Sequence, residues 1–217
     1  MNENLQKNKS ISKKQSWDKS WEKVFQMNEW GKYPPEELIR FMGRNFYKKN
    51  RKQVKVLDLG CGTGACSWYV AREGFSVYGV DGSKTAINLA KKRFFQENLK
   101  GNFFQMDYIN LKFADEFFDL IIDINSIQHN KISKIPEIVE EINRVLKPGG
   151  YFFSILISTK TTKNKNLENK GHIHYFKLNE TRKLFKNLGI KNIEKSFRTE
   201  NNRKNKIYHW ILTCEKL

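Results

Sequence analysis

Residues 57–64 read LDLGCGTG, an acid followed by closely spaced glycines at the end of an apolar stretch. Glycine allows positive φ and lets a ligand approach the main chain closely. Gly60, Gly62 and Gly64 therefore predict a ligand-binding bend. Asp58, two residues before the first glycine, places a carboxylate at the end of a strand that otherwise looks buried.

Two further acids stand at the ends of later apolar runs. Asp81 ends the run FSVYGVD and precedes Gly82, and Asp107 ends the run NFFQMD and precedes Tyr108. A carboxylate has two oxygens and can accept hydrogen bonds from two donors on one ligand. In an open parallel sheet the strands' carboxyl ends flank the ligand crevice, so we expect these acids to line one site.

The elements that must position these acids alternate between strand and helix. Strands are predicted over 54–59, 75–81, 102–107, 117–124 and 151–158, and helices near 64–73, after Ser83 and over 135–146. Two last strands, 190–198 and 206–216, have no helix between them and predict an antiparallel hairpin at the sheet edge. We expect an α/β fold: a doubly wound seven-stranded sheet, mostly parallel with an antiparallel last strand, and helices on both faces.

The N-terminal part differs in character from the rest. Residues 1–16 are polar and predict a disordered tail, whereas residues 17–50 predict a helical N-terminal extension or lid on a domain formed by residues 51–217. Apolar spacing assigns Ile39 and Leu89 to the inward faces of their helices. Asn179 is expected to cap a helix that ends at Gly189, and Trp17, Trp21 and Phe25 to form one aromatic helix face.

The glycine stretch admits two ligands. Gly60-x-Gly62-x-x-Ala65, with Asp81 about 20 residues further on, fits the dinucleotide fingerprint. The same stretch closely resembles motif I of the class I S-adenosylmethionine-dependent methyltransferases, an acid followed by x-G-x-G-x-G. That loop passes under the methionine half of the cofactor, where no pyrophosphate is bound, so Asp58 favours the methyltransferase interpretation.

The resemblance extends along the chain and implies a cofactor site. VYGVDGS (77–83), QMDYINL (105–111), FDLIIDINSIQHN (118–130) and INRVLKPGGYFFS (142–154) resemble later motifs of that family, in order. It implies S-adenosylmethionine as cofactor, Asp81 on both ribose hydroxyls, Asp107 on the adenine amino group with Tyr108 beside it, and Asn125 and Ser126 at the methionine end. The cofactor set implied is Asp58, Gly60, Cys61, Gly62, Asp81, Gly82, Asp107, Tyr108, Asn125 and Ser126. Trp30 and Tyr33 either cap the cofactor or pack between the extension and the domain.

Three histidines are candidates for the acceptor side of the reaction. His129 follows the fourth strand and is either a general base or a polar helix cap. His172 and His174 stand at i and i+2 before a helix near the expected site rim. They lack a third ligand at useful spacing, so we predict no metal. His209 is expected to pack.

Composition leaves the acceptor open. The chain has 217 residues, 40 basic and 23 acidic, for a net charge of +17. An AT-rich coding sequence would explain the lysine excess, and no separate RNA-binding module is visible. A small-molecule acceptor, either a metabolite or a sugar-like compound, with an oxygen or nitrogen atom receiving the methyl group, is favoured over tRNA or rRNA. A cofactor-binding domain that has lost catalysis is a third possibility.

The apolar runs and the cysteines indicate where in the cell the protein is located. No apolar run approaches ~20 residues, so no membrane span is expected. The N-terminus lacks the apolar segment of a secretory signal. Three cysteines without a CxxC pair predict a reduced, cytoplasmic chain without disulfides, as a monomer or homodimer.

Overall fold

The computed structural model describes residues 16–27, 31–162, 171–200, 202 and 204–217. The helices are α1 (Ser20–Met27), α2 (Glu36–Phe46), α3 (Ala65–Arg72), α4 (Lys84–Gln96), α5 (Ile135–Val145) and α7 (Leu178–Phe185). The strands are β1 (Lys55–Leu59), β2 (Ser76–Asp81), β3 (Asn102–Gln105), β4 (Phe118–Ile124), β5 (Leu146–Ile157), β6 (Ile190–Glu200) and β7 (Asn205–Glu215). The predicted disordered tail falls, apart from Ser16, outside the described residues.

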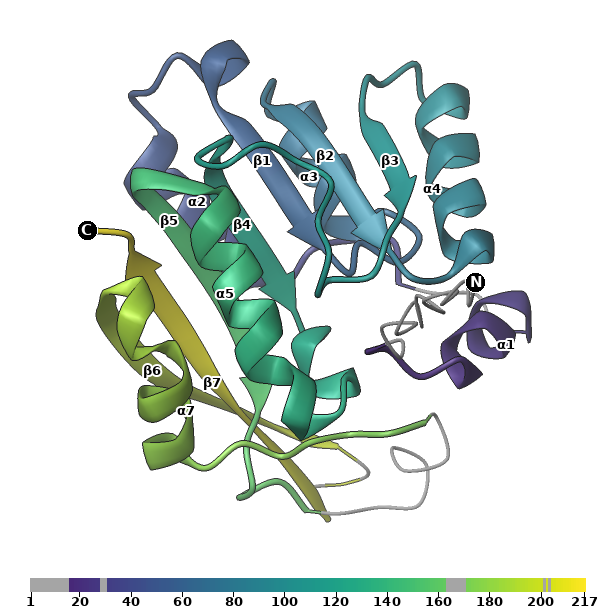
Figure 1. The fold of residues 1–217 in the computed structure, drawn as a ribbon. Helices are drawn as coiled ribbons and strands as arrows, with labels where there is room; N and C mark the ends of the chain where they lie inside the picture. Colours follow the sequence, from purple (N-terminus) through teal and green to yellow (C-terminus); the bar gives the residue numbers. More distant parts are fainter. Residues whose placement is uncertain (1–15, 28–30, 163–170, 201, 203) are drawn as a thin grey trace, which may run out of the picture.

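The seven strands form one sheet in the order β3-β2-β1-β4-β5-β7-β6. All pairs from β3 to β5 are parallel, and β7 is antiparallel to both of its neighbours. The predicted doubly wound sheet and terminal hairpin are confirmed (Figure 1). The chain runs outward from β1 to β3 and then returns to β4, so the strand order reverses between β1 and β4. Ligands of open α/β sheets bind at the carboxyl ends of such strands.

Two apolar layers cover the sheet because successive side chains of a strand point to opposite faces. Leu57 of β1 packs in a cluster with residues of α5 and α7, whereas Val56 packs in a cluster with residues of α2 and α3. Figure 1 shows α5 and α7 in front of the sheet and α2 and α3 behind it. The helix α2, which was assigned to the N-terminal extension, packs in the second of these layers.

Two predicted inward side chains are exposed. Leu38, Phe41 and Met42 of α2 are buried, but Ile39 lies beside this stripe and faces solvent. On α4, Leu89 is exposed because it is two positions from buried Ile87, about 200° around the helix. The assignments of Ile39 and Leu89 to the core were wrong. Counting apolar residues without their angular position overestimated both apolar faces.

Two predicted boundaries also differ. β5 begins at Leu146, five residues before its expected start. Leu146 pairs with Phe118 of β4. The residue that caps α7 is Lys177, whose main-chain N–H donates to Glu180 at 3.2 Å, so the expected cap Asn179 lies inside the helix. Ser83 caps α4 as predicted, since its hydroxyl accepts from the Ala86 N–H at 3.1 Å.

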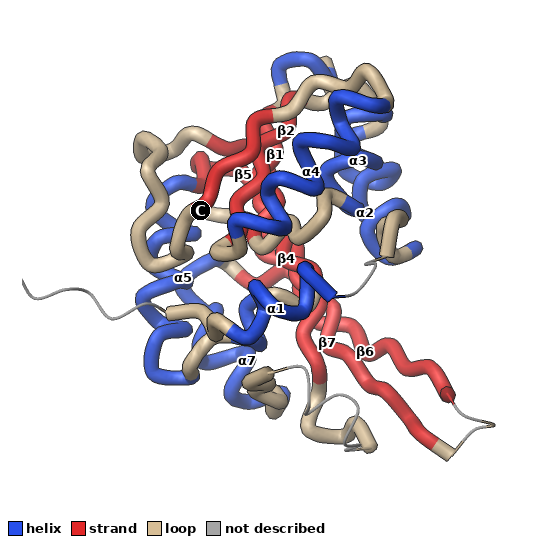
Figure 2. The backbone as a smooth tube through the Cα atoms, turned by 90° about the vertical axis from the view of Figure 1, so that its right-hand side faces the viewer, coloured by secondary structure: helices blue, strands red, loops and turns tan. Residues whose placement is uncertain are grey.

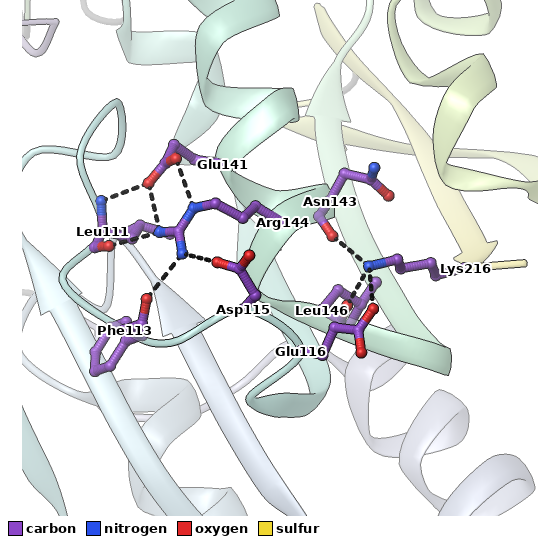
Figure 3. A network of polar contacts seen from close by, with 9 residues as sticks. All are labelled: Leu111, Phe113, Asp115, Glu116, Glu141, Asn143, Arg144, Leu146 and Lys216. Atoms are coloured by element: carbon purple, nitrogen blue, oxygen red, sulfur yellow. Dashed lines mark hydrogen bonds and ion pairs between the residues drawn. The ribbon is translucent and has the colours of Figure 1, made fainter.

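A charged network at the end of α5 fixes the loop between β3 and β4 (Figure 3). The Arg144 guanidinium donates to Glu141, to Asp115 and to the carbonyls of Leu111 and Phe113, at 2.7 to 2.9 Å. The two carboxylates raise the pKa of Arg144. The network lies at the opposite end of β4 from the site described below, and it anchors the segment that leads into β4.

Two elements extend past the carboxyl ends of the parallel strands. α1 lies beyond the ends of β2 and β3 (Figure 1), and the β6–β7 hairpin projects away from the body of the sheet (Figure 2). Ser16, which was placed in the disordered tail, is buried and leads into α1. None of the helices in the described part of the chain is long and apolar enough to cross a bilayer.

Candidate functional site

The glycine bend follows β1 at the switch point of the sheet. Gly60, Gly62 and Gly64 all have positive φ, at 75°, 51° and 86°. The Gly60 and Cys61 N–H groups donate to the carbonyl of Val80 at 2.8 and 3.0 Å, which ties the bend to the end of β2. Glycine is required because the αL conformation disfavours other side chains.

Asp58 lies under this bend and is buried. Its Oδ2 accepts from the Ser67 N–H at 2.9 Å and from the Ser67 hydroxyl at 2.6 Å, at the start of α3. Burial, together with the charges of Asp81 and Asp123, raises the pKa of Asp58 to about 7. A nearby cationic ligand group would lower it again.

Asp81 ends β2 and touches the glycine bend directly. Its Oδ2 accepts from the Gly62 N–H at 3.0 Å and its Oδ1 from the Ser83 N–H at 2.8 Å. Burial raises the pKa of Asp81 to about 6. Each carboxylate oxygen has two lone pairs, so both oxygens keep capacity for a ligand hydroxyl.

The turn after β4 is shaped by a buried acid that the sequence analysis did not single out. Asp123 accepts from the N–H groups of Ser126 and Ile127 at 3.0 and 2.9 Å, and from the Ser154 hydroxyl at 2.6 Å. Burial raises the pKa of Asp123 to about 6. Within this turn Asn125 has a φ of 58°, and its buried Oδ1 has no hydrogen-bond partner in the described structure. A buried acceptor without a partner indicates a missing donor, such as one on a ligand.

His129 lies in the one-turn helix Ile127–His129 and is held between two segments. Its Nδ1 lies 2.9 Å from the His172 carbonyl, and its ring meets Trp21 edge-on with centroids 4.4 Å apart. A carbonyl accepts only, so Nδ1 carries the proton and Nε2 has the free lone pair. Burial lowers the pKa of His129 to about 4, so the ring is neutral at pH 7.

These groups converge on one cavity of about 360 Å³. Eleven of the predicted site residues line it: Tyr33, Asp58, Gly60, Cys61, Gly62, Asp81, Gly82, Tyr108, Asn125, Ser126 and His129. His172 lines an adjacent cavity that shares His129 and Trp17 with the first. Tyr33 also contacts Trp68 edge-on and is largely exposed, at 73%.

Besides His172, two predicted residues that the structure describes, Asp107 and His174, do not line the main cavity. Asp107 accepts from the Ser16 hydroxyl and, at 2.8 Å, from the Ser16 N–H. His174 lies 3.0 Å from Glu180 and packs edge-on against Phe176, so it supports the start of α7. Trp30 lies outside the described residues.

The N-terminal segment contributes residues that sequence reasoning had not assigned to a site. Trp17 packs directly on Gly82, where an added Cβ would lie 2.4 Å from the indole. Trp21 and Phe25 of α1 line the cavity, as do Arg198 of β6 and His209 of β7. The spacing of the aromatic residues was a usable signal, but the strand positions depend on long-range pairing that no local pattern reveals. His209, expected only to pack, is at the cavity wall.

Metal ligands are not gathered in this site. Within the described residues no group of three or more His, Cys, Asp or Glu side chains has a geometry that could hold an ion. The three cysteines are all buried thiols, and burial raises the pKa of each of them. A buried thiol with a raised pKa is a poor nucleophile.

Comparison with known proteins finds a family match for part of the chain. Residues 56–150 match the profile of the family described as "Methyltransferase domain". An uncharacterized methyltransferase of Bacillus subtilis, YodH, is 28% identical over 144 residues, which are 64% of this chain and 60% of the relative. A ubiquinone biosynthesis O-methyltransferase of Pelagibacter ubique is 32% identical over 133 residues, 61% of this chain and 54% of the relative. The chain thus matches less than two thirds of either relative's length.

Solved structures share the fold. The PH0226 protein of Pyrococcus horikoshii superposes with a TM-score of 0.65 at 24% identity, covering 84% of this chain and 89% of that one. The magnesium protoporphyrin IX methyltransferase of Synechocystis, solved with bound S-adenosylmethionine, gives 0.64 at 15% identity, covering 91% and 80%. The predicted resemblance to class I S-adenosylmethionine-dependent methyltransferases is confirmed.

Proposed function

We propose that this chain, whose residues 56–150 match the methyltransferase domain family, transfers a methyl group from S-adenosylmethionine to a small-molecule acceptor. The observation that carries the proposal is the cavity itself. It brings the glycine bend, Asp58 and Asp81 together with a neutral histidine, His129. A cofactor held by the first group would present its reactive end to an acceptor beside the second.

The residues present fit the cofactor. Asp81 is placed to accept from ribose hydroxyls, and Asp58 is a buried carboxylate suited to the methionine ammonium group. The unpartnered Oδ1 of Asn125 supplies a further acceptor for an N–H of the ligand. S-adenosylmethionine supplies a methyl group that is already activated by a sulfonium charge. The protein must therefore mainly align the acceptor and exclude water.

His129 is proposed to act on the acceptor. Its Nε2 lone pair is free to accept a hydrogen bond from an acceptor hydroxyl, and the His172 carbonyl fixes the ring in that tautomer. Because its pKa is lowered to about 4, His129 orients the hydroxyl well but takes its proton only if the acceptor is itself fairly acidic. His174, bound to Glu180, is proposed to support α7.

The N-terminal segment is proposed to close the site. Ser16 binds Asp107, Trp17 covers Gly82, and α1 contributes Trp21 and Phe25 to the cavity wall. Such an enclosure excludes water and suits a small acceptor more than a nucleic acid. If Asp107 binds the adenine amino group, Ser16 must first release it, so this segment would open for the cofactor to enter.

We also propose the type of acceptor atom, the cellular location and the oligomeric state. An oxygen acceptor is favoured over nitrogen, since one relative is named an O-methyltransferase. A cytoplasmic location is proposed because three free thiols suit a reducing compartment, and a monomeric or homodimeric state is proposed beside it. Tyr33 is proposed to stand near the cavity mouth, because it lines the cavity and is largely exposed.

The proposal is tested by incubating the protein with S-adenosylmethionine labelled in its methyl group. Fractionated small metabolites and bulk tRNA serve as separate acceptor pools. Label is expected to enter a small-molecule fraction and not the tRNA. Label in tRNA alone, with binding to tRNA that weakens steeply as salt rises, would instead support the RNA alternative.

A further inference from the structure

The part of the cavity contributed by α1 and the strand ends is largely apolar. Trp21 and Phe25 form a tilted aromatic pair with ring centroids 5.8 Å apart. Ile157 at the end of β5, Ile207 on β7 and Ile173 line the same cavity. Aromatic and branched side chains of this kind pack well against a flat ring, because aromatic groups combine large apolar faces with favourable edge contacts.

A single strong cation faces this apolar region. Arg198 is the only lysine or arginine among the described residues that line the cavity, although the chain has 40 basic residues. It lies on β6 and pairs in register with Ile207 of β7. A lone arginine in an apolar cavity wall is better explained by a ligand than by the general basicity of the surface.

Arg198 is held in place by a contact that a ligand could replace. Its Nε and Nη2 both lie 3.2 Å from one oxygen of Glu200, and the two side chains are 65% and 44% exposed. An exposed ion pair of this kind contributes little to stability. A carboxylate that engages both N–H groups with two oxygens makes a stronger, bidentate pair.

The other titratable groups near this wall add no second positive charge to that of Arg198. Burial lowers the pKa of both His129 and His209 to about 4, so both rings are neutral at pH 7. Glu37 is paired with the hydroxyl of Ser196, at 3.2 Å, on the strand that carries Arg198. A ligand carboxylate that takes the place of Glu200 on Arg198 keeps one negative partner for this cation, whereas a doubly charged phosphate would add a further negative charge beside Glu37.

We infer that the acceptor is a flat aromatic molecule bearing one carboxylate, that this carboxylate binds Arg198, and that the ring lies against Trp21 and Phe25. The inference rests on the proposed function, because it assumes that the cofactor occupies the glycine-bend side of the same cavity. Arg198 is then a specificity-determining residue, not one that takes part in methyl transfer.

The test compares aromatic acids with their neutral isosteres. Hydroxylated benzoates, phenylacetates and cinnamates are titrated into the protein saturated with S-adenosylhomocysteine, each beside the alcohol in which CH₂OH replaces the carboxylate. At least one acid is expected to bind about 10-fold or more tightly than its alcohol, in line with a charge-assisted bidentate pair.

Single substitutions identify the side chain that causes the preference for the acid over the alcohol. Arg198→Met is expected to abolish the preference for the acid and leave the affinity of the alcohol unchanged, whereas Arg198→Lys keeps part of the preference. Glu200→Gln removes the competing carboxylate and is expected to tighten acid binding about 2-fold. Lys206→Met, on β7 in the same hairpin but not lining the cavity, is the control and is expected to change neither affinity.

Two outcomes overturn the inference: no acid in the panel binds better than its alcohol, or Arg198→Met weakens acid and alcohol alike. Binding of S-adenosylhomocysteine, measured first, separates this from a failure of the proposed function. If that ligand does not bind, the proposed function fails. If it binds with unchanged affinity in every variant and the acids are not preferred, only the assignment of the acceptor fails.

Discussion

A Cβ atom on Gly60 would lie 1.7 Å from Ser126 Oγ. Ser126 belongs to the turn after β4, and its hydroxyl is 2.8 Å from Tyr108 Oη, in the loop after β3. The same Cβ would lie 2.5 Å from that Oη. The missing side chain at residue 60 therefore lets loops from three strand ends meet at one point.

Gly60→Ala is expected to disrupt this meeting point. The variant combines a positive φ of 75° with a direct overlap, which together should lower the free energy of unfolding by about 3 kcal/mol and abolish S-adenosylhomocysteine binding. Gly43→Ala is the matched control, since no atom lies within 4 Å of an added Cβ in the middle of α2. It should stabilise the protein by about 0.5 to 1 kcal/mol. Thermal unfolding and calorimetry distinguish the two, and unchanged binding in Gly60→Ala would contradict the assignment of the bend.

Asp58→Asn is expected to weaken binding of S-adenosylmethionine and to stabilise the protein at pH 8. The folded-state pKa of about 7 exceeds the ordinary 3.8, so the native protein holds this proton more tightly than the unfolded chain. The contribution of Asp58 to stability is therefore present at low pH and falls as the pH rises through this interval. The variant should melt higher than the wild type at pH 8 but not at pH 4, while its affinity for S-adenosylmethionine falls about 10-fold. Parallel melting curves across this pH range would contradict the account.

His129→Gln is expected to lower kcat by about 100-fold once an acceptor is known, while the affinity for S-adenosylhomocysteine stays within about 2-fold. The wild-type kcat should show no titration of His129 between pH 6 and 8, because the pKa of its ring is near 4. His174→Gln is the control, as His174 contacts Glu180 outside the cavity, and it should reduce stability only. Full activity in His129→Gln would remove this residue from the mechanism.

The sequence predicted those features of the fold that depend on local patterns. Gly60, Gly62 and Gly64 were recognised from their spacing, and Asp58 and Asp81 from their positions at strand ends. Contacts between distant segments were not predictable in this way. Ser16 meets Asp107 across 91 residues, and Arg198 reaches the cavity only because β7 inserts between β5 and β6. Asp123 was missed because its contacts with Ser126, Ile127 and Ser154 depend on the turn after β4 and on the pairing with β5, which no local pattern reveals.

Ser16→Ala is expected to tighten cofactor binding. The Ser16 hydroxyl occupies Asp107, the acid assigned to the adenine amino group, so its removal frees an acceptor for the ligand. Loss of one such hydrogen bond should lower the Kd for S-adenosylhomocysteine about 2- to 5-fold. The gain should vanish in the Asp107→Asn background, as a double-mutant cycle requires for a direct contact. Weaker binding in Ser16→Ala would show that Ser16 belongs to the binding surface.

Calorimetric titration of the wild-type protein with S-adenosylhomocysteine, beside NAD⁺, tests the central claim most directly. The account predicts saturable binding of the first ligand at one site per chain, reduced at least about 10-fold by Asp81→Asn, and no binding of NAD⁺. Absence of heat with S-adenosylhomocysteine, or saturation by NAD⁺ instead, would contradict the assignment of the glycine bend to a methyl donor.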